Sequence, residues 1–550
     1  MLNQTVFNTS EICFQLGVKH AVFSPGSRNA PLIVSFSRNS KITKKIIPDE
    51  RAAGFVALGI AQYTKEPVVL CCTSGTALLN YAPAIAEAYY RQIPLIVLSA
   101  DRPPELIDQR DGQTIRQFEV LKNHVKTTVQ LPVVEHSKDE DHYEKSLVGA
   151  VQKSTSGPKG PVHINVPFRE PFYPANSQDL KFTSPKYISD LGKQRQEMDF
   201  DIPPCRKVLV LIGQNEFDNS IIQLTNEVAE ILPVIRSPLN NLENGINHVD
   251  GFINNQDELV PDLLITSGLS VLSKKLKQFL KTNKPSLHLH FDPDGVPVDT
   301  FQSEPRLVKQ SIDTVLHRLM ELDLDPSYLK KWEAYESACQ NTITEEMKTG
   351  EFSEATATKQ ILAHLQEGSL LHLSNSMPVR YADLFGLKKG VQSFCNRGTS
   401  GIDGCTSTAV GTALVTEERN VLITGDVAFF YDTNAFFHNY KVPNLKVIIM
   451  NNQGGGIFRL IDGPSGLPEL EEYFETRHQL TAEYICAQNG FDYYPVGTQS
   501  ELESHLGKVL AKSEKTTVME VFTEPEVNQR VYKKLRKSLN EQVSKLEESL

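Results

Sequence analysis

Residues 420–456 read NVLITGDVAFFYDTNAFFHNYKVPNLKVIIMNNQGGG. An apolar run of strand length ends at Thr424, and the following Gly425-Asp426 has the composition of a tight turn. A second apolar run leads into Asn452, which stands 26 positions after Asp426. Because a crossover between parallel strands needs about a dozen residues or more, we expect Asp426 and Asn452 at the same edge of two adjacent parallel strands.

This pair of polar residues predicts a metal site. A carboxylate, an amide oxygen and a free backbone carbonyl among the glycines at 454–456 are hard ligands, which suit Mg²⁺. Phosphate oxygens and water would complete the coordination. The alternative is that Gly-Asp and Asn-Asn are ordinary turn residues. The crossover spacing, together with the glycines at 454–456, favours the metal site.

Short apolar strands, small-residue turns and amphipathic helices alternate along most of the chain, for example over 20–37, 44–64 and 67–91. Such alternation predicts an α/β protein with doubly wound parallel sheets and ligands at the carboxyl ends of the strands. We expect three α/β domains, at residues 1–180, 200–340 and 355–550. The polar stretch 176–205 is predicted to be a linker, and a second linker is expected around 323–337. The tail 531–550 is expected to be a solvated helix.

The composition excludes several classes of protein. The 550 residues carry 56 basic and 67 acidic side chains, a formal net charge of −11, and no basic run, which argues against nucleic acid as a partner. No apolar stretch reaches the roughly 18 residues of a membrane span, and the N-terminus has no signal-peptide pattern. The eight cysteines form no CxxC motif. They are expected to be reduced, buried thiols in a cytoplasmic protein.

Arginine and serine residues recur where strands are predicted to end. SPGSRN contains Ser27 and Arg28, and ADRPPEL contains Arg102. Since a guanidinium group binds a carboxylate through two parallel hydrogen bonds, several such arginines at one sheet edge favour substrates with several carboxylates. For any single arginine a surface salt bridge is the commoner role, and it is the convergence of four arginines on predicted strand ends that favours substrate binding. The complete set that we expect to bind substrate comprises Ser27, Arg28, Arg102, Gln113, Ser376, Arg380 and Arg397.

The Gly-Asp…Asn-Asn pair resembles the diphosphate-binding signature of thiamine diphosphate (ThDP) enzymes, although Val427 stands where that signature has a second glycine. The order of the three blocks matches the pyrimidine-binding, central and diphosphate-binding domains of that superfamily, which implies a ThDP-binding fold. Glu50, in IIPDERAAGFVALGIA, falls on the glutamate that hydrogen-bonds N1′ of the cofactor and activates it. Without the distant pair, Asp49 and Glu50 would both be interpreted as helix-capping residues. With it, only Asp49 keeps that role.

A narrower resemblance is carried by SPGSRNAPL, DERAAGFVALGIA, TSGTA, ADRPPEL, HINVPFREP, NRGTSGIDG and NNQGGGIF. These motifs resemble the MenD family, the 2-succinyl-5-enolpyruvyl-6-hydroxy-3-cyclohexene-1-carboxylate synthases of menaquinone biosynthesis. The resemblance implies ThDP- and Mg²⁺-dependent decarboxylation of 2-oxoglutarate and 1,4-addition of the succinyl carbanion to isochorismate. It implies that the cofactor is bound by Glu50, Ile402, Gly425, Asp426, Asn452, Gly454, Ile457 and Phe458.

The same resemblance implies several further assignments. Phe458 and Ile461 would line the substrate site, and Ile402 would support the bent cofactor. Lys275 falls where the family has an arginine. Its ammonium group would bind a carboxylate as a point charge and not through two parallel hydrogen bonds. A solvated lysine-rich helix face is an equal alternative for Lys275. His163 and His438 are expected to be structural, with His438 on the helix after the Gly-Asp turn.

Three other functions stay open at this point. Another ThDP-dependent 2-oxo acid carboligase or decarboxylase, similar to acetolactate synthase, would share the cofactor residues. A nicotinamide-dependent dehydrogenase needs a glycine-rich turn that GQNEFDNS (213–220) lacks. A catalytically silent ThDP-fold protein would not need Glu50. The superfamily also implies a homodimer as the minimum assembly, with homotetramers common in the family. Residues 460–478, which have Gly and Pro hinges and no periodicity, are expected to form a mobile lid.

Overall fold

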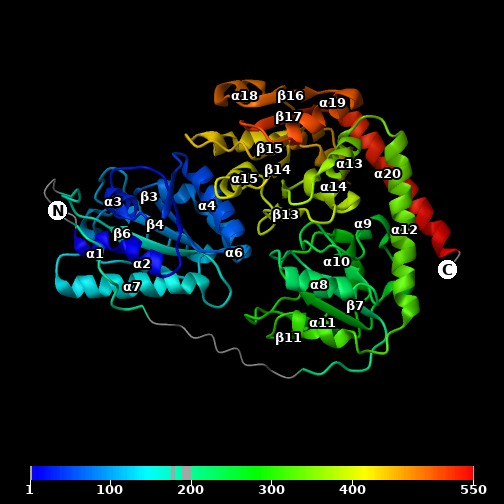
Figure 1. Ribbon diagram of the computed structural model, residues 1–550, viewed down its shortest axis with the longest axis horizontal. Coiled ribbons are helices and arrows are strands. Elements are labelled where there is room, and N and C mark those ends of the chain that lie inside the picture. The colour runs from blue at the N-terminus through cyan, green and yellow to red at the C-terminus, as the bar shows by residue number, and fades with distance from the viewer. Residues whose placement is uncertain (1–2, 175–179, 189–199, 462, 549–550) are drawn as a thin grey trace. The chain divides into compact units, whose positions relative to one another are not determined.

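The computed structural model describes residues 3–174, 180–188, 200–461 and 463–548, and it contains three parallel β-sheets with helices on their faces (Figure 1). The strands are rich in Val, Ile and Leu and are buried along most of their length, as expected where helices cover both faces of a sheet. This confirms the predicted fold class.

The first sheet has the strand order β2-β1-β3-β4-β6-β5, and all neighbours are parallel. Its strands are β1 (His20–Phe23), β2 (Thr43–Ile46), β3 (Val68–Cys72), β4 (Leu95–Asp101), β5 (Thr128–Gln130) and β6 (Val162–Pro167). The helices connected to it are α1 (Gln4–Phe7), α2 (Thr9–Gln15), α3 (Ala30–Arg38), α4 (Glu50–Thr64), α5 (Ala77–Asn80), α6 (Ala82–Tyr90) and α7 (Ser137–Thr155).

The central sheet has the order β11-β10-β9-β7-β8. Leu209 and Leu211 of β7 belong to one hydrophobic cluster, whereas Val208 and Val210 belong to another, so alternate side chains fill the two faces. Its strands are β7 (Val208–Ile212), β8 (Val234–Ile235), β9 (Leu263–Ser267), β10 (Leu287–Phe291) and β11 (Arg306–Val308). Its helices are α8 (Asn219–Val228), α9 (Val249–Phe252), α10 (Lys274–Thr282) and α11 (Asp313–Leu319).

The third sheet has the order β13-β12-β14-β15-β17-β16, which repeats the strand order of the first sheet. Its strands are β12 (Leu370–Leu373), β13 (Gln392–Cys395), β14 (Asn420–Gly425), β15 (Leu445–Asn451), β16 (Asp492–Val496) and β17 (Thr517–Phe522). Its chain segments also form α13 (Glu354–His364), α14 (Met377–Phe385), α15 (Cys405–Ala413), α16 (Asp426–Tyr431), α17 (Ile457–Leu460), α18 (Glu483–Asn489) and α19 (Gln499–Leu510).

The chain divides into two compact units. Unit 1 contains residues 1–194, 396–417 and 431–442, and unit 2 contains 195–395, 418–430 and 443–550. Unit 1 therefore combines the first sheet with α15, which comes from the third part of the sequence. Each of the three expected domain ranges holds one sheet, and their folding as separate domains stays a prediction.

Helices α4 and α15 pack closely inside unit 1 because glycines stand at their crossing. A Cβ atom on Gly59 would lie 2.0 Å from the Thr408 carbonyl oxygen, and one on Gly411 would lie 2.2 Å from the Val56 carbonyl oxygen. No side chain fits at either distance. The two backbones are thus in direct contact, and this contact fixes the start of α4 against the segment that leads into α15.

Two long helices differ from what the sequence predicted. The expected linker around 323–337 is instead part of α12 (Pro326–Thr349), whose Trp332 and Tyr335 are fully buried. The tail is part of α20 (Pro525–Glu547), and it is not a solvated helix. Its residues Leu535 and Leu539 are fully buried in the same cluster as Trp332. Apolar residues spaced three or four apart give both helices a buried stripe among many charges.

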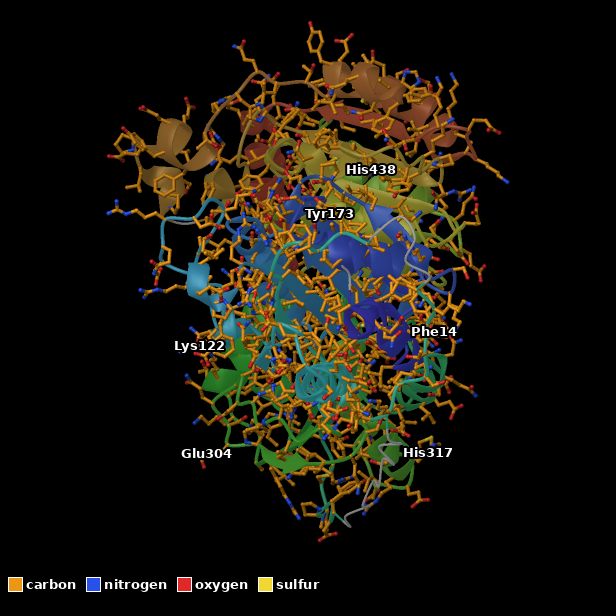
Figure 2. The ribbon with its side chains drawn as sticks, turned by 90° about the vertical axis from the view of Figure 1, so that its left-hand side faces the viewer. Phe14, Lys122, Tyr173, Glu304, His317 and His438 are labelled. Atoms are coloured by element: carbon orange, nitrogen blue, oxygen red, sulfur yellow. The ribbon has the colours of Figure 1, made fainter. Side chains whose placement is uncertain are left out.

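Further expectations concerned the cysteines, the first linker and membrane-spanning segments. All eight cysteines are free, and all but Cys205 are buried as predicted; their reduced state stays a prediction. Part of the expected linker 176–205 lies outside the described residues. Among the residues that are described, no helix is long and apolar enough to cross a bilayer. In the central-sheet region, Glu304 and His317 are exposed and project outward (Figure 2).

Candidate active site

The structure brings Asp426 and Asn452 to one edge of the third sheet. Strands β14 and β15 are parallel neighbours in which Gly425 is paired with Met450. Asp426 follows the first strand directly, and Asn452 follows the second. Their side chains are almost entirely buried, at 2% and 6% relative exposure for the two residues. The spacing argument from the sequence is therefore confirmed for the placement of this pair.

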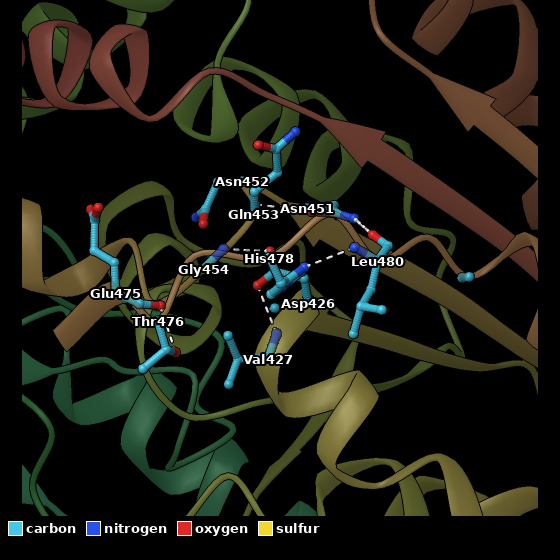
Figure 3. Close-up of polar contacts among 12 residues, drawn as sticks. Asp426, Val427, Asn451, Asn452, Gln453, Gly454, Glu475, Thr476, His478 and Leu480 are labelled. Carbon is cyan, nitrogen blue, oxygen red and sulfur yellow. Dashed lines mark hydrogen bonds and ion pairs between the residues drawn. The ribbon is translucent and has the colours of Figure 1, made fainter. Parts of the chain in front are cut away.

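The carboxylate of Asp426 is held by backbone amides. One oxygen accepts a hydrogen bond from the Val427 amide at 2.7 Å, and the other accepts one from the Gly454 amide at 2.9 Å (Figure 3). The second bond joins the turn after β14 to the glycine segment after β15. These two bonds fix the plane of the carboxylate before any cation binds.

Asn452 contacts a carboxylate that the sequence analysis did not single out. Its Nδ2 atom donates a hydrogen bond to Oε1 of Glu354, the first residue of α13. Glu354 is 3% exposed. Burial raises the pKa of Glu354 to about 7, and the nearby charge of Asp426 acts in the same direction. Asp426, Asn452 and Glu354 all belong to unit 2.

His478 also reaches Asp426, from the segment that was expected to be a lid. Its Nε2 atom lies 3.4 Å from Oδ2 of Asp426, and its Nδ1 atom accepts a hydrogen bond from the Leu480 amide at 3.1 Å (Figure 3). An acceptor role for Nδ1 places the proton of a neutral ring on Nε2, facing the carboxylate. The ring of Phe430 packs against the imidazole edge to face.

The expected lid, residues 460–478, contains two short helical segments that the sequence, with no periodicity there, did not indicate. A 3₁₀ turn spans Pro464–Gly466, and a π-helix spans Leu470–Glu475. The Glu475 carbonyl accepts a bond from the Gly455 amide at 2.8 Å, and its carboxylate binds Arg459 at 2.7 Å. A Cβ atom on Gly454, whose φ is 159°, would lie 2.6 Å from that carbonyl oxygen. The glycine thus permits the close approach, and mobility of the segment stays a prediction.

The residues of this edge fit a magnesium ion. Among the described residues, no group of three or more His, Cys, Asp or Glu side chains is arranged as a metal site. The expected set differs from such a group, because it combines one carboxylate with the amide oxygen of Asn452 and the carbonyl oxygen of Gly454. Hard oxygen donors of this kind, with open positions for phosphate and water, are what Mg²⁺ requires. The buried Asp426 carboxylate supplies the negative charge.

Glu50 is the first residue of α4, at the carboxyl edge of the first sheet. The side chain of Asp49 accepts a bond from the Ala52 amide at 3.0 Å, which confirms its capping role. Burial raises the pKa of Glu50, and the charge of Asp49 contributes in the same direction. Cys72 and Tyr81, both fully buried, are close enough to interact with this charge. A half-buried carboxyl group with a raised pKa is suited to exchanging a proton.

Unit 1 also brings Ile402 close to the start of α4. Arg51, the neighbour of Glu50, donates from Nη1 to the carbonyl of Asp403, the neighbour of Ile402, at 2.8 Å. Glu87 of α6 accepts bonds from the amides of Gly398 and Thr399 at 2.8 and 2.7 Å. These bonds fix the segment that carries Arg397 and Ile402. Glu50 and Ile402, far apart in the sequence, are therefore held in one framework.

Arg28 and Arg102 lie close together in unit 1. Nη1 of Arg28 donates to the Phe168 carbonyl at 3.0 Å, and the guanidinium lies over the ring of Phe172. Burial lowers the pKa of Arg28, and the neighbouring positive charge of Arg102 adds to this effect. The two arginines follow β1 and β4, and Ser27 stands beside them, exposed.

Arg102 is oriented by three bonds. Its Nε donates to Asp111 at 2.9 Å, Nη1 to the hydroxyl of Ser74 at 3.0 Å, and Nη2 to the Gly112 carbonyl at 2.8 Å. Gln113 follows with a left-handed backbone, φ 54°, against Gly75. Because β1 and β3 are the adjacent strands at which the order of the first sheet reverses, this is the edge where doubly wound sheets bind ligands.

The remaining predicted residues are divided between the units. Ser376 caps α14 with φ 76°, and its carbonyl accepts a bond from Nη1 of Arg380 at 2.6 Å, both in unit 2. Arg397 belongs to unit 1. Phe458 lies on α17 with Ile457, and Ile461 just after it is 43% exposed.

Lys275 is not on a solvated helix face. Its position near the start of α10 is half-buried, and burial lowers the pKa of its ammonium group to about 8. The positive charge of Arg536 acts in the same direction, whereas Asp250 opposes the shift. A substrate contact of Lys275 stays a prediction.

His163 is a buried core residue of β6, as predicted, with Nε2 2.8 Å from the Ser99 hydroxyl. His438 does not lie on a helix. It follows the 3₁₀ segment Thr433–Phe436, and its Nδ1 atom accepts a bond from the Tyr440 amide (labelled in Figure 2).

Sequence reasoning missed the residues that hold the predicted ones in place, chiefly Glu354, His478, Ser74 and Asp111. Each of them acts through a contact that the fold creates. Only Glu354 had a local signal, since FSEATAT has the pattern of a helix start. That pattern predicts a helix and not a contact with Asn452.

Comparisons with known proteins agree on one family. A family model described as "Thiamine pyrophosphate enzyme, N-terminal TPP binding domain" matches residues 9–120. A protein of Cytophaga hutchinsonii named 2-succinyl-5-enolpyruvyl-6-hydroxy-3-cyclohexene-1-carboxylate synthase is 42% identical over 98% of this chain and 99% of its own length. Proteins with the same name from Flavobacterium psychrophilum and Bacteroides fragilis are 40% and 33% identical, each over 94% of this chain and 96% and 95% of their own lengths.

Proposed function

The chain belongs to the 2-succinyl-5-enolpyruvyl-6-hydroxy-3-cyclohexene-1-carboxylate synthase family, and we propose that it catalyses the reaction for which that family is named. It decarboxylates 2-oxoglutarate and adds the succinyl carbanion to isochorismate in a 1,4-addition, with release of CO₂. It uses thiamine diphosphate and Mg²⁺, for which Mn²⁺ can substitute. The reaction belongs to menaquinone biosynthesis.

One observation supports this proposal above the others. Asp426 and Asn452 emerge side by side from β14 and β15, in a chain that matches named synthases over nearly its full length. A relationship of that extent covers all three sheets and every residue assigned to the site. A nicotinamide-dependent dehydrogenase would have no use for this buried set of oxygen donors, and a silent ThDP-fold protein would have none for Glu50.

The residues of the third sheet would hold the metal ion and, through it, the diphosphate. Asp426, Asn452 and Gly454 supply the protein oxygens, and Gly425 leaves open space beside Asp426 because a Cβ atom there would meet nothing within 4 Å. Ile457 and Phe458 lie at the start of the short helix that follows. Thiamine diphosphate, once bound, supplies the carbanion chemistry that the side chains of the protein lack.

Glu50 would hold a proton at the pyrimidine N1′ position of the cofactor. Its raised pKa keeps a protonated form accessible, so that it can donate a hydrogen bond to a ring nitrogen and take the proton back. The capped helix start fixes where that carboxyl group lies. The bond between Arg51 and Asp403 keeps Ile402 near the start of α4, where Ile402 would support the bound cofactor.

The arginine residues would bind the substrate carboxylates. Arg28 and Arg102 lie together at the edge of the first sheet and, with Ser27, would bind isochorismate. Arg380 and Arg397 would bind the part derived from 2-oxoglutarate, and Gln113 and Ser376 would add further substrate contacts. Phe458 and Ile461 would exclude water from the reacting atoms, and Lys275 would add a point charge. Both substrates are dicarboxylates, which accounts for several arginines in an acidic protein.

We further propose a cytoplasmic enzyme that is a homodimer at minimum and a homotetramer in its complete form. In this superfamily the cofactor lies between the pyrimidine-binding part of one subunit and the diphosphate-binding part of another. Glu50 belongs to unit 1 and Asp426 to unit 2. One complete site would then take Glu50 from one subunit and Asp426 from its partner.

The test is CO₂ release from 2-oxoglutarate by the purified protein with Mg²⁺ and ThDP, measured with and without isochorismate. Release that requires ThDP and is strongly stimulated by isochorismate supports the synthase. If other 2-oxo acids are consumed and isochorismate has no effect, the protein is instead a carboligase similar to acetolactate synthase.

A further inference from the structure

We propose that Glu354 is a positioning residue that sets the amide orientation of Asn452, so that Asn452 presents its Oδ1 atom to the metal ion. This inference rests on the proposed function, because it concerns the metal that the synthase requires. Glu354 stands 98 positions before Asn452 in the sequence, and nothing local connects the two.

The chemistry requires such a selection. A side-chain amide has two ends of nearly the same shape, of which only the oxygen can bind a cation. Nδ2 is the donor end of the amide, and in the structure it is this end that bonds to Oε1 of Glu354. The bond from Nδ2 of Asn452 to Glu354 therefore directs Oδ1 away from Glu354. Asp426 needs no equivalent partner, because its two ends are the same.

Glu354 is itself held rigidly. Its backbone amide donates to Oδ1 of Asn528 at 2.9 Å, and Nδ2 of Asn528 donates to the Thr523 hydroxyl at 2.9 Å. With 3% exposure, Glu354 has no freedom to turn toward solvent. The carboxylate is thus a fixed reference against which the amide is oriented.

The other side of the amide is shaped for the same orientation. A Cβ atom on Gly456 would lie 2.5 Å from Nδ2 of Asn452. Glycine at this position leaves room for the amide nitrogen beside Glu354. The missing side chain makes room for the amide group, and the accepting carboxylate of Glu354 selects its orientation.

The first experiment compares metal binding by E354A and S353A. Mn²⁺ is titrated calorimetrically into each folded protein at saturating ThDP, and thermal unfolding is recorded in parallel. We expect E354A to lose on the order of 10- to 100-fold in Mn²⁺ affinity, as when the partner of a metal ligand is removed. S353A removes the cap of the same helix without touching Asn452. It should lower the unfolding temperature and leave the affinity unchanged.

The second experiment reverses donor and acceptor. N452D places a carboxylate against Glu354 and should weaken Mn²⁺ binding. Adding E354Q supplies an amide that donates to that carboxylate, so N452D/E354Q should bind Mn²⁺ at least about tenfold more tightly than N452D alone. A merely structural role of Glu354 would not produce this rescue.

The proposal is overturned if E354A binds Mn²⁺ like the wild type, if S353A loses as much affinity as E354A, or if E354Q fails to improve N452D. Mn²⁺ binding by the wild-type protein distinguishes a failure of this inference from a failure of the proposed synthase function. A wild-type protein that binds Mn²⁺ with ThDP but makes no product refutes the synthase and leaves this inference standing. A wild-type protein that binds neither Mn²⁺ nor ThDP refutes both the synthase function and this inference.

Discussion

The first and third sheets have the same strand order, but they present different chemistry at corresponding edges. After the third strand of the first sheet stands Thr73-Ser74-Gly75, and the Ser74 hydroxyl accepts a bond from Arg102. After the third strand of the third sheet stands Gly425-Asp426, joined to Gly454. One edge thus gathers guanidinium groups, which suit carboxylates, and the other gathers oxygen donors, which suit a cation. The topology determines where ligands bind, and the turn residues determine which.

The functional side chains at the two edges are also held in place by contacts of different range in the sequence. The bonds that orient Arg102 come mostly from residues within about ten positions of it in the sequence. The metal ligands of the third sheet depend on Glu354 and His478, which come from distant segments. We therefore expect the third-sheet edge to be more sensitive to remote substitutions.

E50Q tests the catalytic half of this comparison and should have the largest effect. Removing the ionisable carboxyl group while keeping its shape should lower turnover roughly 10²- to 10⁴-fold. ThDP affinity should stay close to that of the wild type, because the diphosphate is held elsewhere. Steady-state rates and calorimetric ThDP titration measure the two effects separately. Near-normal turnover would remove Glu50 from its assigned role.

D426A tests the binding half. Loss of the only charged metal ligand should weaken Mg²⁺-dependent ThDP binding by at least about 100-fold, more than loss of an outer partner does. Saturating ThDP and Mg²⁺ should restore part of the turnover, unlike in E50Q. Unchanged cofactor affinity in the same titration would refute the metal assignment.

G411V tests the packing that fixes Glu50. With a Cβ atom only 2.2 Å from the Val56 carbonyl oxygen, the helices α4 and α15 must separate. We expect a loss of about 3 kcal/mol or more in unfolding free energy, measured by urea denaturation. G149A is the control, because a Cβ atom there meets nothing within 4 Å in helix α7. It should be neutral or stabilising by about 0.5–1 kcal/mol. Equal effects of the two changes would contradict the packing argument.

Each sheet contains at least one buried histidine, which predicts a shared pH dependence. Burial lowers the pKa of His163, His288 and His372 to about 4, from 6.5 in an exposed imidazole. Below pH 6.5 the unfolded chain therefore binds protons that the folded chain excludes, so stability falls as the pH drops from 6.5 toward 4. Urea denaturation of H288Q and the wild type at about pH 7.5 and 5.5 measures one contribution. The loss on acidification should be smaller in H288Q, and an equal loss would contradict the account.

The sequence was sufficient for the parts that rest on local pattern. Strand, turn and helix alternate so regularly that the three sheets, the cap at Asp49 and the meeting of Asp426 with Asn452 could be predicted. Glu354 could not, because its role depends on a contact that exists only in the fold. α12 and α20 were misjudged for a different reason. Their buried residues, such as Trp332 and Leu535, are spaced regularly, but abundant charges on the other faces obscured the stripe.

Our central proposal is that one cofactor molecule is bound by Glu50, at the edge of the first sheet, and by Asp426, at the edge of the third sheet, from two different subunits. It is tested most directly by coexpressing E50Q and D426A with different tags and purifying the mixed dimers. At limiting ThDP and Mg²⁺ each parent has little activity, but a mixed dimer then holds one site with both defects and one site with none. We predict recovery of about half of the wild-type activity per dimer. Mixed dimers as inactive as their parents would contradict the claim.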